Sequence, residues 1–517
     1  MLKSRVSAVA LIAAGSIVST ASAQPLPRSD LALLNRVSWG ASPSSEIEMA
    51  RVGAEAWLQS QLHPAAGDHL RQEVQAQIAA LTISKRSMAE LARAAAGANQ
   101  FANVLPTPEQ RQQAQGLYQQ GMNELAQEAV TRSLLRDLYS DDQLKEQMTW
   151  FWLNHFNVQA GKADVRATVG DFENSAIRPH ALGRFRDLLE ATLKHPAMLR
   201  YLDNADNAVG HINENYAREL MELHTMGVGS GYSQADVQQL AAILTGVGID
   251  LGAGDPRVQP AHAADLIHAG LFEFNPTRHD YGDKVLLGHP IKGRGFSEVE
   301  EALDILSSQP ATARHISTEI AEYFVSDTPP PGLIDAMVQT WAASDGDIAS
   351  VLNTLFHAPA FRASLGGKFK DPMHYAVSAL RFAYDGRTVE NAAPLQGWLS
   401  QMAEPLYGHE TPDGYAMTAA AWDAPGQMAA RFEIARQLGA GAAALFKLPV
   451  PASAPAGSPA PAQPAPPSAP PGPPQLQSVS ADIGAPLSPA TSAALAQAAT
   501  PAEWNTLYLA SPEFMRR

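Results

Sequence analysis

The stretch NENYARELMELHTMGVGSGYSQADVQQLAAILTGVG, residues 213–248, decides the fold because it joins two helical patterns through a clear break. In its first half, apolar residues recur at helical spacing and polar residues fill the opposite side. A glycine-rich turn then follows at 227–231. Ser233 and Asp236 form a capping-box pattern before a second apolar run, so we interpret Asp236 as a helix cap. The stretch predicts helix, turn and capped helix, and we expect any functional site to be built here.

The first of these helices carries the most chemistry. On a helical wheel over residues 212–225, one continuous face holds Glu214, Asn215, Arg218, Glu219 and Glu222. Glu219 and Glu222 are three positions apart, so they can share a divalent metal ion or act as an acid and base pair. A solvated, salt-bridged helix surface explains the same pattern without any chemistry. His224 points to nearly the opposite face, so we expect it to face the core.

Two other regions supply candidate partners for this face. The aromatic segment LKEQMTWFWLNHFNV, residues 144–158, contains Asn154 and His155, and this histidine is either a core residue or part of a polar pocket. The loop-rich region 250–295 contains His279 beside Asp280, which offers a base or a pair of metal ligands. The predicted catalytic residues are Arg218, Glu219, Glu222, His279 and Asp280. The predicted substrate-binding residues are Asn154, His155, Asn213, Glu214, Asn215 and Lys284.

Composition excludes several classes of function. The chain has 517 residues, with 52 acidic and 37 basic ones, and its formal net charge is −15. This acidity argues against a nucleic-acid partner, because phosphate binding needs basic patches. The chain has no cysteine, which excludes disulfides, thiolate metal sites and cysteine nucleophiles. It also lacks G-x-S-x-G, H-E-x-x-H and Walker motifs.

The first residues have the pattern of a secretory signal peptide. Lys3 and Arg5 precede a short apolar run at 6–18, and the A-x-A sequence at 21–23 marks a cleavage site. An uncleaved membrane anchor is the alternative reading. No other apolar run approaches 18 residues, so we expect no transmembrane segment after cleavage. The sequence therefore predicts a bacterial protein that is periplasmic or secreted.

The remainder predicts a mainly α fold, with a large multi-helix globular domain over 24–448, loop-rich insertions and a small β-hairpin near 270–290. Residues 449–474 form a Pro/Ala/Ser tract that cannot bury enough surface to order itself, so we expect a disordered insertion. The remaining residues, 475–517, are too few for an independent core. We expect this C-terminal helical segment to pack back on the main domain.

The motif at 213–246 closely resembles the bacterial family called domain of unknown function 1800 (DUF1800). Further segments resemble it in the same order: WFWLNHFNV, IRPHALGRFRDLLEATLKHPAMLRYLDN, HDYGDKVLLG, QPATARHISTEIAEYFVSDTPP, GGKFKDP, PDGY and LASPEF. The resemblance implies an exported, mostly helical protein, and it marks the polar face and the His279–Asp280 pair as family motifs. The family name assigns no activity. Val247 stands where the pattern leads us to expect Trp, and the Pro-rich tract looks peculiar to this chain.

Three hypotheses follow. The first is an exported hydrolase acting on a polysaccharide or another envelope polymer through Glu219 and Glu222. In it, Arg218 holds an anionic or hydroxyl-rich group, the Trp/Phe set near 150 forms a stacking wall, and His279 and Asp280 close over the site. The second is a metal-dependent enzyme or metal carrier, with a divalent metal ion held by Glu219, Glu222, His279 and Asp280. The third is a non-catalytic envelope binding or assembly protein.

Overall fold

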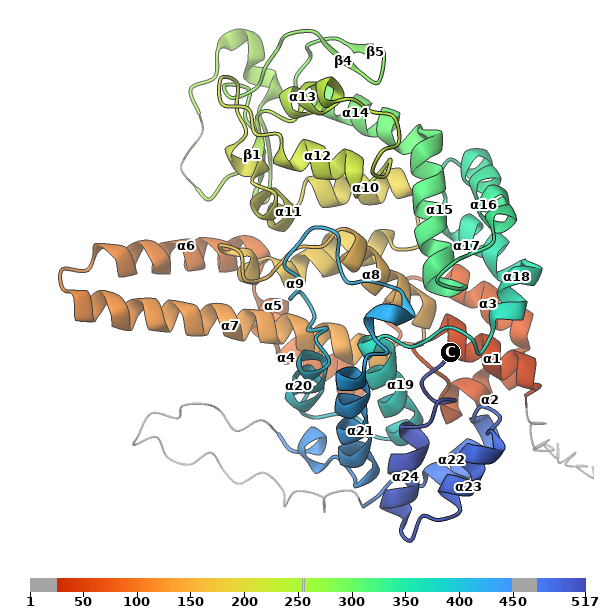
Figure 1. Ribbon diagram of the computed structural model, residues 1–517. Coiled ribbons are helices and arrows are strands. Elements are labelled where there is room, and N and C mark those ends of the chain that lie inside the picture. Colours follow the sequence, from red (N-terminus) through yellow and green to blue (C-terminus); the bar gives the residue numbers. More distant parts are fainter. Residues whose placement is uncertain (1–25, 253, 255, 449–471) are drawn as a thin grey trace, which may run out of the picture.

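The computed structural model describes residues 26–252, 254, 256–448 and 472–517. The predicted signal peptide, and residues 449–471 of the predicted Pro/Ala-rich insertion, lie outside the described residues. The fold is mainly helical, as predicted, with a few three-residue strands. Figure 1 shows helices arranged around the central α8 (Gln143–His155).

The centre of the fold is α8, because nearly all of its residues are buried. Its aromatic residues Trp150, Phe151 and Trp152 belong to one large hydrophobic core. Trp150 stacks on Tyr323, and Trp152 donates its indole N–H to the carbonyl oxygen of Ala181 at 2.9 Å. Burial of these large rings stabilises the fold, since apolar area removed from water contributes about 25 cal/mol per Å².

Three groups of helices surround α8 in Figure 1. The upper group is α10 (Phe185–Leu193), α11 (Pro196–Tyr201), α12 (Asn215–Glu222), α13 (Gln234–Ile243) and α14 (Phe296–Ser308). The group at the right is α15 (Pro310–Phe324), α16 (Pro331–Ser344), α17 (Ile348–His357) and α18 (Pro359–Ser364), with α1 (Arg28–Val37), α2 (Pro43–Val52) and α3 (Ala54–Leu62). The lower group is α19 (Pro372–Tyr384), α20 (Ala393–Gln401), α21 (Pro425–Gly439), α22 (Leu476–Ile483), α23 (Pro489–Leu495) and α24 (Pro501–Leu509).

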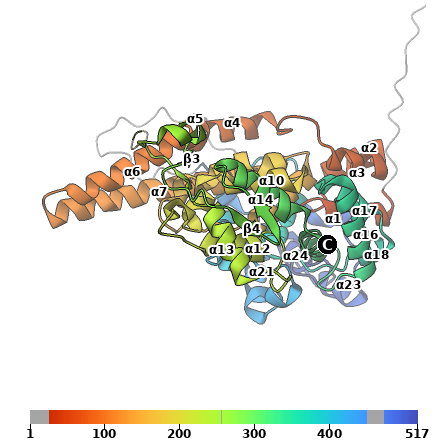
Figure 2. The ribbon, with the colours of Figure 1, turned by 90° about the horizontal axis from the view of Figure 1, so that it is seen from above.

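A helical hairpin projects from this body, as both ribbon views show (Figures 1 and 2). It consists of α6 (Met88–Val104) and α7 (Pro108–Tyr139). Ser87 and Glu90 form a capping box at the start of α6, and Thr107 caps α7 ahead of Pro108. Shorter helices α4 (Gln72–Ala80), α5 (Thr82–Lys85) and α9 (Val169–Asp171) pack against α7.

Two small antiparallel sheets lie in the upper group. In the first, β3 (Phe272–Phe274) pairs with both β1 (Val247–Ile249) and β2 (Ile267–Ala269). The second is the hairpin of β4 (Lys284–Leu286) and β5 (His289–Ile291). The region of the predicted hairpin, near 270–290, thus contains β3 of the first sheet and most of the β4–β5 hairpin.

The C-terminal helices contact the main body directly. α24 packs on α21, and α22 contacts α19. The buried Arg517 donates to the side-chain oxygen of Gln147 on α8 at 3.0 Å and to the carbonyl oxygen of Tyr323 at 2.9 Å. These contacts join the last residue described to the centre of the fold. None of the described helices has the length and apolar content needed to cross a membrane.

Candidate functional site

α12 separates its apolar and polar faces as the wheel predicts. Tyr216, Ala217, Leu220 and Met221 are buried, whereas Arg218, Glu219 and Glu222 are half-buried. The guanidinium of Arg218 lies 3.2 Å from a Glu214 oxygen and 3.7 Å from a Glu222 oxygen. It also donates to the side chain of Gln234 on α13 at 2.8 Å. Arg218 is therefore held between two carboxylates and the neighbouring helix.

The amides before and at the start of α12 stabilise its local fold. The Asn213 side-chain oxygen accepts the backbone N–H of Asn215 at 2.9 Å, and its amide nitrogen donates to the carbonyl oxygen of Asp203 at 3.3 Å. The Asn215 amide donates to the carbonyl oxygen of Leu202 at 3.2 Å. These bonds tie the preceding loop to the helix, which positions Glu219 and Glu222 one and two turns later.

The loop that contains Asp413 and Tyr415 meets this polar face. Asn154 accepts the backbone N–H of Tyr415 at 2.7 Å and donates to its carbonyl oxygen at 2.9 Å. Gly414 between them has a φ of 70°, and a Cβ there would lie 2.3 Å from the Asn154 carbonyl oxygen. Only glycine fits this close approach. The anchored loop brings Asp413 close enough to Glu219 for their charges to interact.

The carboxyl groups at this meeting point differ in acidity. Burial, reinforced by the charges of Glu222 and Asp413, raises the pKa of Glu219. Burial acts in the same direction on Asp413, but hydrogen bonds from Thr411 and His409 outweigh it and lower the pKa of Asp413. Burial and a hydrogen bond to Glu222 raise the pKa of Tyr232 to about 12. Glu219 is thus the group most easily protonated beside a carboxylate that stays ionised.

His155 lies next to this group in a small polar cavity of about 50 Å³, lined by Asn154, Glu319 and Asp413 among others. Its ring Nδ1 lies 2.7 Å from a Glu319 oxygen, and its Nε2 lies 3.2 Å from the carbonyl oxygen of His224. Burial alone would raise the pKa of Glu319, but the charge and hydrogen bond of His155 lower it. His155 is therefore held by Glu319 and the backbone of His224, in a cavity that it shares with Asp413.

His224 faces the core, as the wheel predicts. It is fully buried, and neither ring nitrogen has a hydrogen-bond partner among the residues that the structure describes. Burial lowers its pKa well below the usual value, and the charges of His155 and His315 lower it further.

His279, Asp280 and Lys284 belong to a different cluster. His279 Nε2 and Lys284 Nζ lie 3.0 and 2.7 Å from the two oxygens of Glu298, and all three side chains are buried. The Asp280 side chain accepts the backbone N–H of Gly282 at 2.8 Å, within its own turn. In the described residues, the hydrogen bonds and ion pairs of these three side chains are with Thr245, Glu298 and their own loop rather than with α12.

The aromatic residues near 150 do not form an exposed stacking wall. Trp150 and Trp152 are core residues, and Phe151 only borders the small cavity. In the described ranges, no group of three or more histidines, aspartates and glutamates is arranged to hold a metal ion.

A family model described as "Protein of unknown function (DUF1800)" matches residues 32–516. The chain belongs to the DUF1800 family. No curated protein and no solved structure matches it. The match covers α12, the His155 cavity and the loop of Asp413 together.

The sequence-based site omitted two residues of this DUF1800 member that the fold adds. Asp413 lies in the PDGY segment, which marked the family resemblance without suggesting a partner for Glu219. Glu319 lies on α15, four residues after His315, and that spacing was the available signal. Their proximity to α12 depends on packing between segments about 100 and 200 residues apart.

Proposed function

We propose that this protein is an exported hydrolase that cleaves a polysaccharide or a related envelope polymer at the Glu219 face. The observation that carries the proposal is the opposite shift of two neighbouring carboxyl groups: the pKa of Glu219 is raised and that of Asp413 is lowered. Glycoside hydrolysis needs one carboxylic acid to protonate the leaving oxygen and one carboxylate on the other side of the bond.

In this proposal Glu219 is the general acid. Asp413, or Glu222 three residues after Glu219, activates water or attacks the anomeric carbon. Arg218, already held by Glu214 and Glu222, binds a hydroxyl-rich or anionic group of the polymer. The adjoining cavity of about 50 Å³ is far smaller than an ordinary ligand pocket, so the polymer lies across the surface.

The test is hydrolysis of a panel of neutral and acidic polysaccharides and peptidoglycan. Hydrolysis is measured as the release of reducing ends. Glu219→Gln and Asp413→Asn should each lower the rate by about 10²–10⁴-fold, as expected for loss of an acid or base. Glu433→Gln on the surface of α21 is the matched control and should keep the wild-type rate. If both site variants fold and retain full activity on a polymer that the wild type cleaves, the proposal is wrong.

Measurements on the same purified protein distinguish the two alternative functions from hydrolysis. A metal-dependent enzyme or carrier predicts stoichiometric divalent metal in elemental analysis and loss of function after chelation. A non-catalytic binding or assembly protein predicts polymer binding without release of reducing ends. The satisfied network of Arg218 with Glu214, Glu222 and Gln234 supports this second alternative, since it gives the polar face a structural role.

A further inference from the structure

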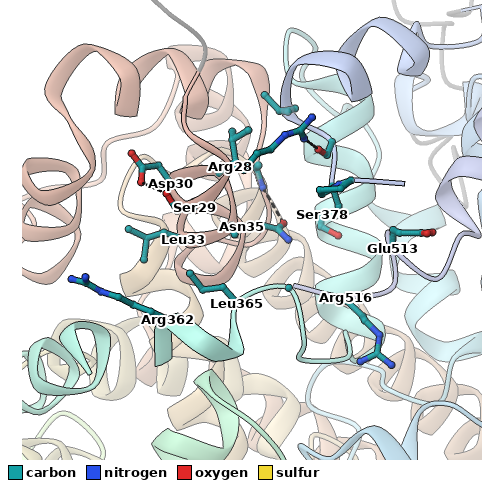
Figure 3. Close-up of a pocket in the computed structure, with 18 of the residues that line it drawn as sticks. Arg28, Ser29, Asp30, Leu33, Asn35, Arg362, Leu365, Ser378, Glu513 and Arg516 are labelled. Atoms are coloured by element: carbon teal, nitrogen blue, oxygen red, sulfur yellow. Dashed lines mark hydrogen bonds between the residues drawn. The ribbon is translucent and has the colours of Figure 1, made fainter. Parts of the chain in front are cut away.

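A large cavity is lined by residues that lie far from Glu219 in the sequence. Its volume is about 930 Å³, and α1, α18, α19 and the C-terminal segment contribute to its lining. Figure 3 shows Asn35, Leu365 and Ser378 in its wall. The lining combines apolar side chains, such as Leu33 and Phe361, with the buried polar pair Lys370 and Ser378. This volume is in the range of cavities that hold small organic ligands.

Lys370 and Ser378 contact each other directly in this wall. Lys370 Nζ lies 2.9 Å from Ser378 Oγ, and both residues are at least 95% buried. Nζ also lies 4.0 Å from the centre of the Phe514 ring. Ser378 Oγ donates to the carbonyl oxygen of Tyr375 one turn earlier at 3.1 Å, which holds its position on α19.

Lys370 lacks the carboxylate partner that normally accompanies a buried ammonium group. Within the described residues its Nζ makes no ion pair, whereas Lys368, two residues earlier, pairs with Asp327 at 2.6 Å. Burial and the positive charges of Arg517 and Arg431 lower the pKa of Lys370 to about 7. The negative charge of Asp371 acts in the opposite direction but does not outweigh them. A lysine amine is then neutral in a large fraction of molecules at neutral pH, and a neutral amine can accept a proton.

The loop after α1 fits closely against Ser378. A Cβ on Gly40 would lie 2.5 Å from the Ser378 Cβ and 3.7 Å from the side-chain oxygen of Asn35. Gly40 has a φ of 117°, which also favours glycine. The Asn35 oxygen accepts the Ala41 N–H at 3.4 Å, as the dashed line in Figure 3 marks. This bond holds the Asn35 side chain in the wall of the same cavity as Ser378.

We propose that Ser378 and Lys370 form a nucleophile and base pair that hydrolyses carboxylic esters with an apolar acyl chain, bound in this cavity. Serine and lysine are a known alternative to the serine, histidine and aspartate arrangement. The side chains of Leu33, Phe361, Leu365 and Phe514 provide apolar surface for the acyl chain. The site is built from other residues than the Glu219 face, and the two activities are independent.

The reaction needs only the ester and water. The Ser378 hydroxyl turns from the Tyr375 carbonyl oxygen toward the neutral Lys370 amine. Its proton moves to Nζ as Oγ bonds to the carbonyl carbon and the carbonyl electrons move to the carbonyl oxygen. When this intermediate collapses, the bond to the alcohol oxygen breaks and Nζ returns the proton to that oxygen. Water then attacks the acyl group on Ser378 and gives its proton to Nζ. Collapse releases the carboxylic acid and restores the serine hydroxyl.

The test uses the full chain and a fluorophosphonate probe, with the modified peptide located by mass spectrometry. We expect a single label on Ser378, with a rate that rises as pH increases through about 7. Hydrolysis of p-nitrophenyl octanoate should follow the same pH profile and stop in Ser378→Ala. Lys370→Met should lower both rates about 100-fold or more, as expected for loss of a general base.

A second measurement does not depend on the stability of the Lys370 variant. Because the chain has no cysteine, Ser378→Cys places a single thiol in the cavity wall. Ser308→Cys is the matched control, since the exposed Ser308 also donates to the carbonyl oxygen three residues earlier. The Ser378→Cys thiol should react with iodoacetamide at pH 7 at least as fast as the control. Absence of fluorophosphonate from Ser378 in folded protein, or a Ser378→Cys thiol that reacts over 100-fold more slowly than the control, would overturn the proposal.

Discussion

Replacement of Glu298 by Ala tests whether the buried cluster around His279 is a structural element. The Glu298 side chain is fully buried and accepts four hydrogen bonds. Two come from His279 at 3.0 Å and Lys284 at 2.7 Å, and two come from the backbone N–H groups of Arg294 at 2.6 Å and Gly295 at 3.1 Å. Truncation to Ala leaves the buried Lys284 ammonium without its carboxylate.

The expected loss follows from this geometry. Removing one partner of a buried ion pair costs about 3–5 kcal/mol, because the other charge stays buried and unpaired. The native state of a typical domain is stable by about 5–15 kcal/mol, so this single change removes a large part of it. We therefore expect Glu298→Ala to lower the free energy of unfolding by about 3–5 kcal/mol at pH 7.

The effect also has a defined pH dependence. Burial alone would raise the pKa of Glu298, but the hydrogen bonds from His279, Lys284 and Arg294 outweigh it and lower the pKa below the usual 4.5. The stabilisation by the Glu298 carboxylate is therefore present above pH 4.5 and is lost as pH falls through the lowered pKa. The difference in free energy of unfolding between the wild type and Glu298→Ala should become smaller below pH 4.5.

Urea unfolding followed by tryptophan fluorescence measures both effects. Glu301→Ala is the matched control, because Glu301 lies on the same helix and pairs at the surface with Arg294. Surface ion pairs contribute about 0–1 kcal/mol, so this control should unfold close to wild type. If Glu298→Ala differs from Glu301→Ala by less than 1 kcal/mol at pH 7, the structural role of the cluster is refuted.

Three further predictions concern the site and its support. Gly414→Ala should destabilise the protein by about 1–3 kcal/mol, because of its positive φ and its contact with Asn154, and thermal unfolding should show a lower Tm than for Gly426→Ala in open space. Asp236→Ala removes a capping box and should cost about 1 kcal/mol in urea unfolding, so an unchanged midpoint would contradict this role. His224 stays neutral in the folded protein but is protonated below about pH 6.5 in the unfolded chain. Its contribution should therefore lower the free energy of unfolding of the wild type by about 1.4 kcal/mol between pH 7.5 and pH 5.5. His224→Leu should lack this decrease in the free energy of unfolding. If the free energy of unfolding depends on pH equally in both proteins, His224 does not have this role.

The sequence by itself determined the local structure around α12. The period of apolar residues predicts its buried and polar faces, and Ser233 with Asp236 predicts the start of α13, because both signals depend on residues within one or two turns. The placement of His224 in the core follows from the same geometry. The mainly α class also follows, since helical periodicity recurs along most of the chain.

Only the tertiary structure decided which distant groups meet. Asp413 approaches Glu219, and Glu319 contacts His155, through packing between segments about 160 to 200 residues apart. Nothing local to any of these segments specifies either contact. Packing likewise joins His279 and Lys284 to Glu298 rather than to α12. Lys370 and Ser378 are only eight residues apart, but their burial depends on α1 and the C-terminal segment, which close the cavity around them. Local spacing therefore predicts the helices and their faces, whereas burial and charge pairing depend on the assembled core.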